Sequence, residues 1–563
     1  MSGDRPRILI LGGYGTFGGR LARLLAAEPR LTLLIAGRSQ TKAGAFCRTL
    51  GGAAEIVPLA FDRDGDLTTQ LAALRPDIVV DATGPFQAYG EAPYRVVEAC
   101  IAAGTDYLDL ADGADFVEGI NRFDDAARAR GVAVLAGVSS FPVLTAAVVR
   151  HLAHGLDRVE SIEGGIAPSP YAGVGLNVIR AIASYAGQEV RLTRNGAPAK
   201  GRALVETRRW TVAPPGRLPL RSTRFSLVDV PDLRLLPALW PGLREIWIGA
   251  GPVPAVLHRG LGILASLVRI GLVPTLRPMA PLFHAAINRL RWGEHRGGMI
   301  VAVRGQNTAG HAVERSWHML AEGDDGPLIP SMAAAAVILR RLQGLRPAPG
   351  ARAAIKDLEL ADYQSLFAGR AITHGCRETT AETARLPLYR RMLGEAFPAL
   401  PAPVQAMHDF SGDRRVSGRA EVERGTSLLA RLVAALVGFP AAGRDVPVEV
   451  AFRVRGEIET WQRRFGGRSF SSTQRAGRGR SEELLEERFG PVRVGLALVL
   501  DGDRLRLVVR RWSLLGLPMP QALAPGGDAW ETAEGGRFRF HVEIRHPWAG
   551  LIVRYRGWLE PEG

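Results

Sequence analysis

Cysteine, lysine and long apolar runs are scarce in this 563-residue chain, and each scarcity excludes a class of protein. The three cysteines, Cys47, Cys100 and Cys376, lack the paired spacing of a zinc site or a redox dithiol, so we expect buried thiols in a reducing compartment and no metal site. The N-terminal residues are polar and lead directly into an apolar segment, without the pattern of a secretory signal. The sequence thus predicts a cytoplasmic protein, and its length predicts about two to four domains.

Lysine is nearly absent although the net charge is +15. Apart from Lys42, Lys200 and Lys356, and histidine aside, the basic side chains are arginines spread over the whole chain. This spread indicates a coding bias rather than a surface built for nucleic acid, so we expect no nucleic-acid partner. The densest cluster, residues 475–480, lies in a Gly-rich stretch that we expect to be solvated, with anionic lipid headgroups as the alternative ligand.

No segment has the pattern of a membrane-spanning helix. The most apolar stretch, residues 251–273, is interrupted by His258, Arg259 and Arg269. A spanning helix needs about 20 apolar residues, and an arginine near its centre costs a few kcal/mol. Two interpretations of this stretch remain: it packs in a domain or subunit interface, or it lies on a membrane surface as a peripheral contact.

A glycine-rich motif follows the first apolar strand, residues 8–11. The strand runs into Gly13-x-Gly15-x-x-Gly18 and then into a helix predicted over residues 19–27. Gly13 suits a tight turn, Gly15 lets the backbone approach a pyrophosphate, and Gly18 lets the helix pack closely on the strand. The helix N-terminus offers N–H groups and a positive dipole end to the phosphates. We therefore predict that Gly13, Gly15, Thr16, Phe17 and Gly18 bind a dinucleotide.

The end of the second predicted strand, residues 31–36, indicates which dinucleotide binds. A site for NAD would place an acidic residue there to accept hydrogen bonds from the ribose 2′-hydroxyl. The chain instead has Arg38, which can fork onto a 2′-phosphate, and Ser39, which can donate to it while capping the next helix. Lys42 follows one turn later. The sequence therefore predicts NADP(H).

The first domain is predicted to be an α/β Rossmann domain with one doubly wound parallel sheet. A loop that follows its fourth strand, Thr83, Gly84, Pro85 and Phe86, falls at the carboxyl edge of the sheet, where it would border the nicotinamide. Six strands are expected, at residues 8–11, 31–36, 55–58, 76–81, 106–110 and 132–136, with helices including 68–74, 92–103 and 116–130.

The region after residue 385 differs in kind because apolar and polar residues alternate strictly along several segments. Such alternation is typical of antiparallel strands with one buried face, and it predicts a curved sheet or barrel. Asp501-Gly502 predicts a tight hairpin, residues 427–437 a helix, and residues 365–380 a weakly patterned connector. The expected strands are 446–458, 492–500, 505–509, 538–544 and 551–555.

Several of these motifs together resemble the saccharopine dehydrogenase-like NADP-binding proteins over roughly residues 1–375. The resemblance rests on residues 12–18, 36–39, 83–90, 99–110 and 323–342. It implies a Rossmann domain at 1–140 and an α+β domain at 141–375 for the substrate and for contacts within a homodimer. Residues 385–563 resemble a bacterial domain of unknown function through segments 465–470, 516–520, 536–540 and 555–559. We expect this β-rich domain either to enclose an apolar ligand or to have a filled core.

The resemblance implies an NADP(H)-dependent oxidoreductase that acts on a small molecule, with hydride transferred to or from the nicotinamide. Two polar positions depart from many relatives: Asp112-Gly113 replaces a Gly-Glu pair, and residues 138–142 replace a Phe-Asp-Ser segment before the proline. The middle of the chain, residues 235–287, is apolar and proline-rich, which favours a lipophilic substrate over an amino diacid. The alternative is a non-catalytic NADP(H)-binding protein whose β domain carries an apolar molecule.

The sequence leaves the catalytic residues unassigned, because no Tyr is followed four residues later by Lys. Tyr89, Tyr107 and Ser139 fall at strand ends or in edge loops where a proton donor could lie, although such residues more often have structural or cofactor-contacting roles. His295, His311 and His318 lack metal-ligand spacing, and we interpret them as ordinary surface or core imidazoles.

Overall fold

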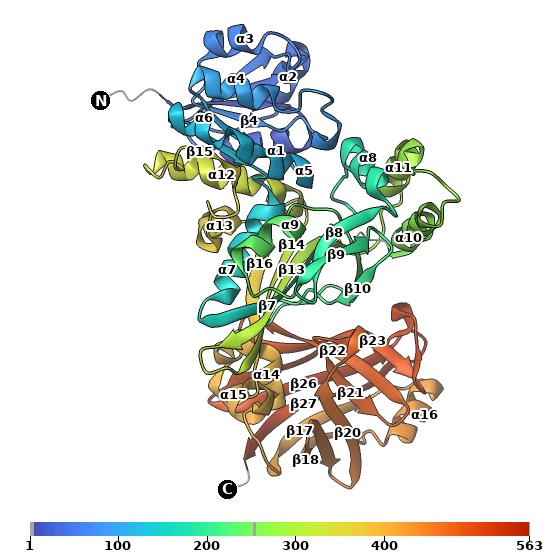
Figure 1. Cartoon of the computed structure of the whole chain (residues 1–563). Helices are drawn as coiled ribbons and strands as arrows, with labels where there is room; N and C mark the ends of the chain where they lie inside the picture. Colours follow the sequence, from blue (N-terminus) through green and yellow to red (C-terminus); the bar gives the residue numbers. More distant parts are fainter. Residues whose placement is uncertain (1–4, 252–254, 562–563) are drawn as a thin grey trace. The chain divides into compact units, whose positions relative to one another are not determined.

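The computed structural model describes residues 5–251 and 255–561, and the chain divides into two compact units (Figure 1). Unit 1 consists of Met1–Arg208, Arg224–Ala312 and Leu320–Thr373. Unit 2 consists of Arg209–Thr223, Val313–Met319 and His374–Gly563.

The first sheet of unit 1 is wholly parallel, with strand order β15-β6-β5-β4-β1-β2-β3. Six of these strands follow the order of a Rossmann fold, 3-2-1-4-5-6. Their short apolar runs are buried, as parallel strands between helices require, except in the edge strand β3, whose residues are half-buried or exposed. The strands are β1 (Arg7–Leu11), β2 (Thr32–Gly37), β3 (Glu55–Ala60), β4 (Ile78–Asp81), β5 (Asp106–Asp109), β6 (Ala133–Ala136) and β15 (Gly350–Ala353).

Two features of this sheet differ from the sequence-based expectation. A seventh strand, β15, pairs with β6 although it comes from residue 350 onward; its sequence, Gly-Ala-Arg-Ala, has no apolar run to reveal it. The predicted helix 116–130 is broken into α5 and α6 by a 3₁₀ turn at Ile120–Phe123. The helices are α1 (Thr16–Leu25), α2 (Gln40–Cys47), α3 (Leu67–Leu74), α4 (Arg95–Ala103), α5 (Ala114–Gly119) and α6 (Asp124–Ala129).

A second, mixed sheet has the strand order β10-β11-β12-β7-β13-β14-β16. The stretch 365–380, expected to be a connector, contains the end of α13 and the strand β16. The strands are β7 (Leu156–Ala167), β10 (Thr207–Trp210), β11 (Thr223–Leu227), β12 (Glu245–Ala250), β13 (Arg296–Asn307), β14 (Ala312–Glu322) and β16 (Ile372–Thr379), beside a hairpin of β8 (Glu189–Arg194) and β9 (Ala197–Arg202).

In the part of the chain that the structure describes, seven helices accompany these strands. Helix α12 packs against α1, and α8 packs against α11. Within the stretch 251–273, residues 252–254 lie outside the described residues and Ala255–Arg269 form α10. The helices are α7 (Thr145–Ala153), α8 (Leu176–Tyr185), α9 (Asp232–Leu235), α10 (Ala255–Arg269), α11 (Ala280–Arg289), α12 (Ile329–Leu342) and α13 (Leu360–Phe367).

The C-terminal part of unit 2 is a closed antiparallel barrel, which resolves the predicted choice between a curved sheet and a barrel. Pairing of β22 with β23 closes ten strands in the order β22-β21-β20-β19-β18-β17-β27-β26-β25-β23. They are β17 (Arg414–Arg424), β18 (Gly443–Arg455), β19 (Ile458–Phe465), β20 (Arg468–Ala476), β21 (Leu485–Phe489), β22 (Val492–Asp501), β23 (Arg504–Leu514), β25 (Ala529–Glu534), β26 (Arg537–His546) and β27 (Gly550–Pro561), with the short β24 (Leu517–Pro518) beside β23.

Side chains of the alternating apolar positions fill the barrel core, among them Phe452, Trp461 and Phe540. The hairpin predicted at Asp501-Gly502 joins β22 to β23. The single strand predicted over 446–458 is instead two, because Gly456 turns the chain with a φ of +59°. Three helices belong to this unit: α14 (Leu388–Leu393), α15 (Ala402–His408) and α16 (Leu428–Val437).

Candidate functional site

A cradle of glycines connects β1 to α1. Gly12, rather than Gly13, is the left-handed residue of the turn, with a φ of +69°. Gly13 is required for close approach instead, because a Cβ there would lie 2.8 Å from the carbonyl oxygen of Ile10. The Gly13 N–H donates to the carbonyl of Ala36 at 2.9 Å, which ties the turn to the end of β2.

The N-terminus of α1 is open to an anion. Gly15 is its N-cap residue and is exposed, and in the described chain no side chain caps the helix. Thr16 is exposed and Phe17 half-buried in the first turn, which has no acidic residue. The first N–H groups of the helix therefore remain for a phosphate, which is the chemistry expected of this motif.

Gly18 fixes how closely α1 approaches the turn. A Cβ at Gly18 would lie 2.3 Å from the Gly12 carbonyl oxygen, a backbone atom that cannot move aside cheaply. A Cβ at Gly15 would have one close contact, with that same oxygen at 3.0 Å. Gly18 thus serves the packing of the cradle, whereas Gly15 leaves space beside it.

The end of β2 is basic, as the sequence predicts. Arg38 and Lys42 are exposed, and in the described parts of the chain neither is paired with a carboxylate. Ser39 caps α2, its hydroxyl oxygen accepting from the Lys42 N–H at 3.3 Å. These three residues surround the position that a ribose 2′-phosphate would occupy at the end of the second strand of a dinucleotide-binding unit.

Tyr14 is a contributor that sequence reasoning missed. Its ring lies against Gly37, where a Cβ would come within 2.5 Å of the ring. Its hydroxyl oxygen accepts a hydrogen bond from the Ser39 N–H at 3.2 Å. Tyr14 therefore links the glycine turn to the basic end of β2, and the glycine at position 37 was the one signal of this contact in the sequence.

A cluster of buried and half-buried polar side chains holds the loop after β4 in place. Thr83 is hydrogen-bonded to Asp81 (2.5 Å) and to the Tyr89 hydroxyl (2.6 Å). Arg63 lies over the Tyr89 ring, 3.4 Å from its centroid, and 3.6 Å from Asp81. Burial, and next the Asp81 charge, raise the pKa of the Tyr89 hydroxyl. Tyr89 thus keeps its proton and anchors the loop.

The remaining predicted loop residues occupy different environments. Gly84 and Pro85 are half-buried at the sheet edge. Phe86 is buried, with its ring centroid 4.8 Å from that of Tyr89 and 5.0 Å from that of Phe116. Its side chain therefore belongs to the core of the domain rather than to an open ligand surface.

Asp109 lies directly beside Asp81 in the register of β5 and β4. Its Oδ1 accepts hydrogen bonds from the N–H groups of Ala111 (3.0 Å) and Gly137 (2.7 Å), and no described residue partners its Oδ2. Burial raises the pKa of Asp109 to about 7, and the two backbone hydrogen bonds oppose the shift. The carboxyl edge of the sheet thus rests on a carboxyl group that titrates near neutrality.

A segment before α8 lies beside both halves of the site, and no motif in the sequence indicates this placement. Arg20 of α1 donates to the Ala172 carbonyl at 3.0 Å. Asn177 of α8 donates to the Gly84 carbonyl at 3.1 Å. Gly175 approaches Thr16 so closely that a Cβ would lie 3.1 Å from its hydroxyl oxygen. Residues 172–177 therefore border the space between the glycine cradle and the loop after β4.

The candidate proton donors are not brought together. Tyr107 is 1% exposed and lies within the core, and Ser139 is half-buried after β6. His318 is buried, with Nδ1 accepting from the Ala213 N–H at 3.2 Å, and burial lowers its pKa well below the usual value. His295 and His311 are exposed. Within residues 5–251 and 255–561, no three His, Cys, Asp or Glu side chains lie close enough to hold a metal ion.

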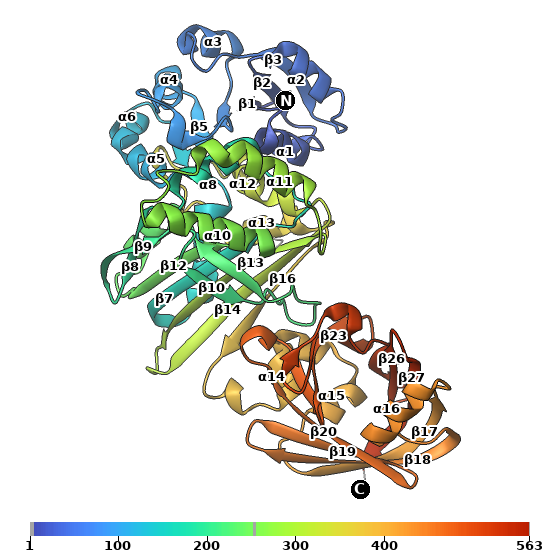
Figure 2. The ribbon, with the colours of Figure 1, turned by 90° about the vertical axis from the view of Figure 1, so that its right-hand side faces the viewer.

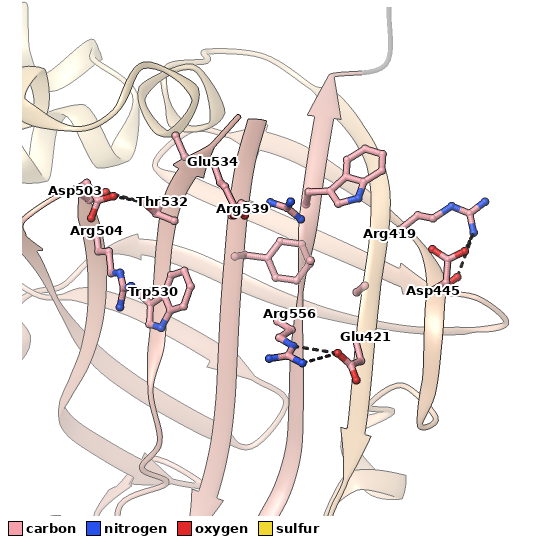
Figure 3. A pocket seen from close by; sticks show the side chains of 15 residues that line it. Arg419, Glu421, Asp445, Asp503, Arg504, Trp530, Thr532, Glu534, Arg539 and Arg556 are labelled. Atoms are coloured by element: carbon pink, nitrogen blue, oxygen red, sulfur yellow. Dashed lines mark hydrogen bonds and ion pairs between the residues drawn. The ribbon is translucent and has the colours of Figure 1, made fainter. Parts of the chain in front are cut away.

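An open groove of about 590 Å³ lies over β17, β25, β26 and β27 of the barrel (Figure 3). Three of its arginines pair with carboxylates: Arg419 is 2.6 Å from Asp445, Arg539 is 3.0 Å from Glu534 and Arg556 is 2.7 Å from Glu421. Because the lining carries four arginines and four carboxylates, the groove has no excess charge with which to select an ion.

Two family models match the chain. Residues 8–135 match the saccharopine dehydrogenase NADP binding domain, and residues 400–559 match DUF4166, a domain of unknown function. The N-terminal domain is a saccharopine dehydrogenase NADP-binding domain. The glycine cradle, the basic end of β2 and the loop after β4 all lie within it. The chain therefore carries the nicotinamide-nucleotide-binding domain of an oxidoreductase family.

Curated relatives match part of this chain over a fraction of their own length. The trans-acting enoyl reductase of Mycobacterium tuberculosis is 34% identical over 110 residues, 19% of this chain and 26% of that protein. That of Mycobacterium ulcerans is 32% identical over 112 residues, again 19% and 26%. Another M. tuberculosis protein is 38% identical over 105 residues, 18% of this chain and 24% of its own. The match thus spans about a quarter of each relative.

One solved structure extends over more of the chain. Saccharopine dehydrogenase (L-Glu forming) of Saccharomyces cerevisiae is 14% identical and covers 66% of this chain and 99% of its own, with a TM-score of 0.46.

None of the described helices has the length and apolar character needed to cross a bilayer.

Proposed function

We propose that this protein is an NADP(H)-dependent oxidoreductase that transfers hydride to or from a lipophilic small molecule. The observation that carries the proposal is the basic end of β2 beside the glycine cradle, where Arg38 and Lys42 are exposed and pair with no carboxylate of the described residues. A nucleotide with its pyrophosphate at α1 places its adenosine ribose at this point. The donor set suits a 2′-phosphate, because Arg can fork onto it and the Ser39 hydroxyl can donate to it.

The chain's own residues supply binding and orientation. The N–H groups at the start of α1 hold the pyrophosphate, and the loop from Thr83 to Phe86 borders the nicotinamide, which supplies or accepts the hydride. Asp81 and Tyr89 fix that loop through Thr83. Asn177 ties the same loop to α8. These contacts hold one edge of the substrate space in place before the cofactor arrives.

The substrate class follows from two observations. The curated relatives that match part of the chain are named as trans-acting enoyl reductases, which favours an enoyl or keto compound. Residues 235–287 are largely apolar and proline-rich. An apolar enoyl or keto compound is therefore a better match than a small amino diacid.

The first test separates NADP(H) from NAD(H). The purified full chain is titrated with NADPH and NADH by nicotinamide fluorescence, together with Arg38→Ala and the control Arg48→Ala. Arg48 is an exposed arginine at the other end of α2. We expect Arg38→Ala to weaken NADPH binding by about 10- to 100-fold, the worth of a charge-assisted phosphate contact, and to leave NADH unchanged. Equal affinities for NADPH and NADH in the unaltered protein would contradict the proposal.

Turnover separates an enzyme from a binding protein. Enoyl thioesters and long-chain ketones are supplied with NADPH, and its absorbance is followed. An oxidoreductase consumes NADPH with one of them and loses that activity in Arg38→Ala, whereas a protein that only carries NADP(H) binds it without consumption. The filled barrel core gives no support to the alternative in which the β domain carries an apolar ligand.

A further inference from the structure

We propose that helices α10 and α11 and the turn between them form a docking surface for an anionic membrane. We call the exposed side chains of residues 258–292 the α10–α11 surface. The proposal concerns a contact that lies flat on the lipid headgroups, and it does not depend on the reaction proposed above.

The α10–α11 surface is unusually apolar for a solvent-exposed face. Six of the 16 large exposed apolar side chains of the described chain lie in this short span. Ile263 and Ile270 are each 64% exposed and Leu272 is 70% exposed. The others are Leu282, Leu290 and Trp292. Monomeric proteins rarely leave such a cluster in water, and a tryptophan among leucines is typical of side chains that enter a membrane interface.

The same surface is purely basic. Arg259, Arg269, Arg277, Arg289 and Arg291 are all exposed. No aspartate or glutamate occurs between residues 251 and 293. Arginines that surround apolar side chains, with no acidic residue between them, complement the negative charge of phospholipid headgroups.

The opposite side of α10 is fixed to the protein. Ala265 and Val268 are buried, and the buried His258 is hydrogen-bonded through Nε2 to the Ser226 hydroxyl at 2.7 Å. Burial lowers the pKa of His258 to about 4, so the ring is neutral at physiological pH. The helix is therefore held by its inner side, and the Ile263 side remains unused by the fold.

Charge argues for lipid rather than for a second copy of this chain. A symmetric pair would place the same patch on both partners, and so would bring arginines against arginines. An anionic lipid surface meets both requirements of the α10–α11 surface, because its headgroups pair with the arginines while its acyl boundary receives the isoleucines and leucines.

The docking surface lies close to the proposed substrate side of the site. In both views α8, α10 and α11 lie together (Figures 1 and 2). Asn288 of α11 donates to the Val174 carbonyl at 3.2 Å, and Asn177 of α8 donates to the Gly84 carbonyl. Residues 172–177 thus connect the docking surface to the cofactor loop. That a lipophilic substrate arrives by this route rests on the proposed function; the docking itself does not.

The test is flotation of the full-length protein with vesicles. One set is phosphatidylcholine mixed with phosphatidylglycerol, and the other is phosphatidylcholine alone. We expect binding to the anionic vesicles, weakening with salt, and little binding to the neutral ones. The single variants Arg259→Ala and Arg269→Ala should each lower the partition coefficient between water and the anionic vesicles by about fivefold.

A triple variant, Ile263→Ser/Leu272→Ser/Leu282→Ser, should abolish flotation because it removes the apolar contact. Its matched control is Leu428→Ser/Leu432→Ser/Leu436→Ser on α16, another helix with exposed leucines (84%, 66% and 80%) in unit 2. NADPH titration of each variant reports folding and the proposed function separately from flotation.

Each of four outcomes would overturn the docking proposal. The first is equal binding to neutral and anionic vesicles, and the second is loss of binding in the α16 variant alone. The third is a protein that binds NADPH but does not float with either set of vesicles. The fourth is a dimer that dissociates in the triple variant at Ile263, Leu272 and Leu282. Flotation by a protein that fails to bind NADPH would instead refute the proposed function and leave the docking surface standing.

Discussion

Two glycines of the cradle, Gly18 and Gly15, should respond differently to an added side chain. Alanine at position 18 places a Cβ 2.3 Å from the Gly12 carbonyl oxygen and 3.0 Å from the Gly13 Cα, both backbone atoms. Overpacking of this kind costs about 1–3 kcal/mol, and the backbone contacts place this case at the upper end. Alanine regains about 1 kcal/mol over glycine inside a helix. We therefore expect Gly18→Ala to destabilise unit 1 by about 2 kcal/mol net.

Position 15 behaves differently in the same backbone. Its φ of −80° and ψ of −175° suit any residue, and an added Cβ meets only the Gly12 oxygen at 3.0 Å. Gly15→Val should leave the apo protein within about 1 kcal/mol of the original, while its side chain occupies the approach of the pyrophosphate. NADPH affinity should fall by about tenfold or more.

Scanning calorimetry with and without NADPH measures both effects. The transition that NADPH raises is assigned to unit 1, because a ligand stabilises the unit that binds it. For a unit of this size, about 2 kcal/mol corresponds to a fall in Tm of roughly 2–6 °C. The reasoning fails if Gly18→Ala leaves the apo Tm unchanged, or if Gly15→Val lowers it as far as Gly18→Ala does.

Two further predictions concern buried titratable groups. Burial raises the pKa of Asp109, so the stability that this group contributes is complete below its unfolded pKa of about 4 and is lost as the pH rises through about 7. The loss is on the order of 2–4 kcal/mol in the free energy of unfolding. Asp109→Asn keeps an oxygen that accepts from the two N–H donors, so the Tm of unit 1 should fall less with rising pH in this variant. In the barrel, Nε2 of the buried His408 lies 2.5 Å from the Glu531 carboxylate. His408→Leu leaves that carboxylate without its partner and should lower the free energy of unfolding of unit 2 by about 3–5 kcal/mol. The double variant His408→Leu/Glu531→Leu should recover part of that loss. Unchanged pH dependence in the first variant, or equal loss in the single and double variants of the second, would contradict these assignments.

The parts of the fold that local sequence determines were predictable. The order strand, glycine motif, helix and basic strand end fixes the first βαβ unit, because each step depends on residues close in the chain. Strict alternation likewise predicted antiparallel strands after residue 440, and the hairpin at Asp501-Gly502 is confirmed by the pairing of β22 with β23.

Long-range pairing was not predictable in the same way. Strand β15 joins the Rossmann sheet from residue 350, and its residues Gly350–Ala353 become a strand because β6 offers a free edge, not because of their own pattern. Closure of the barrel through β22 and β23 depends equally on the register of all ten strands. The positive φ of Gly12 was assigned to its neighbour because the motif places both glycines in one turn.

The same division between local and long-range determinants runs through the candidate site. The residues proposed to hold the phosphates lie on the first two strands and helices, so a sequence motif can identify them. The proposed substrate side depends on contacts between residues far apart in the chain: Asn177 lies 93 residues from Gly84, and Ala172 lies 152 residues from Arg20. The hydroxyl of Tyr89, one of the three candidate donors in the sequence, is hydrogen-bonded to Thr83 and Asp81. We therefore expect the donor to the substrate among the residues that folding brings close to segment 172–177.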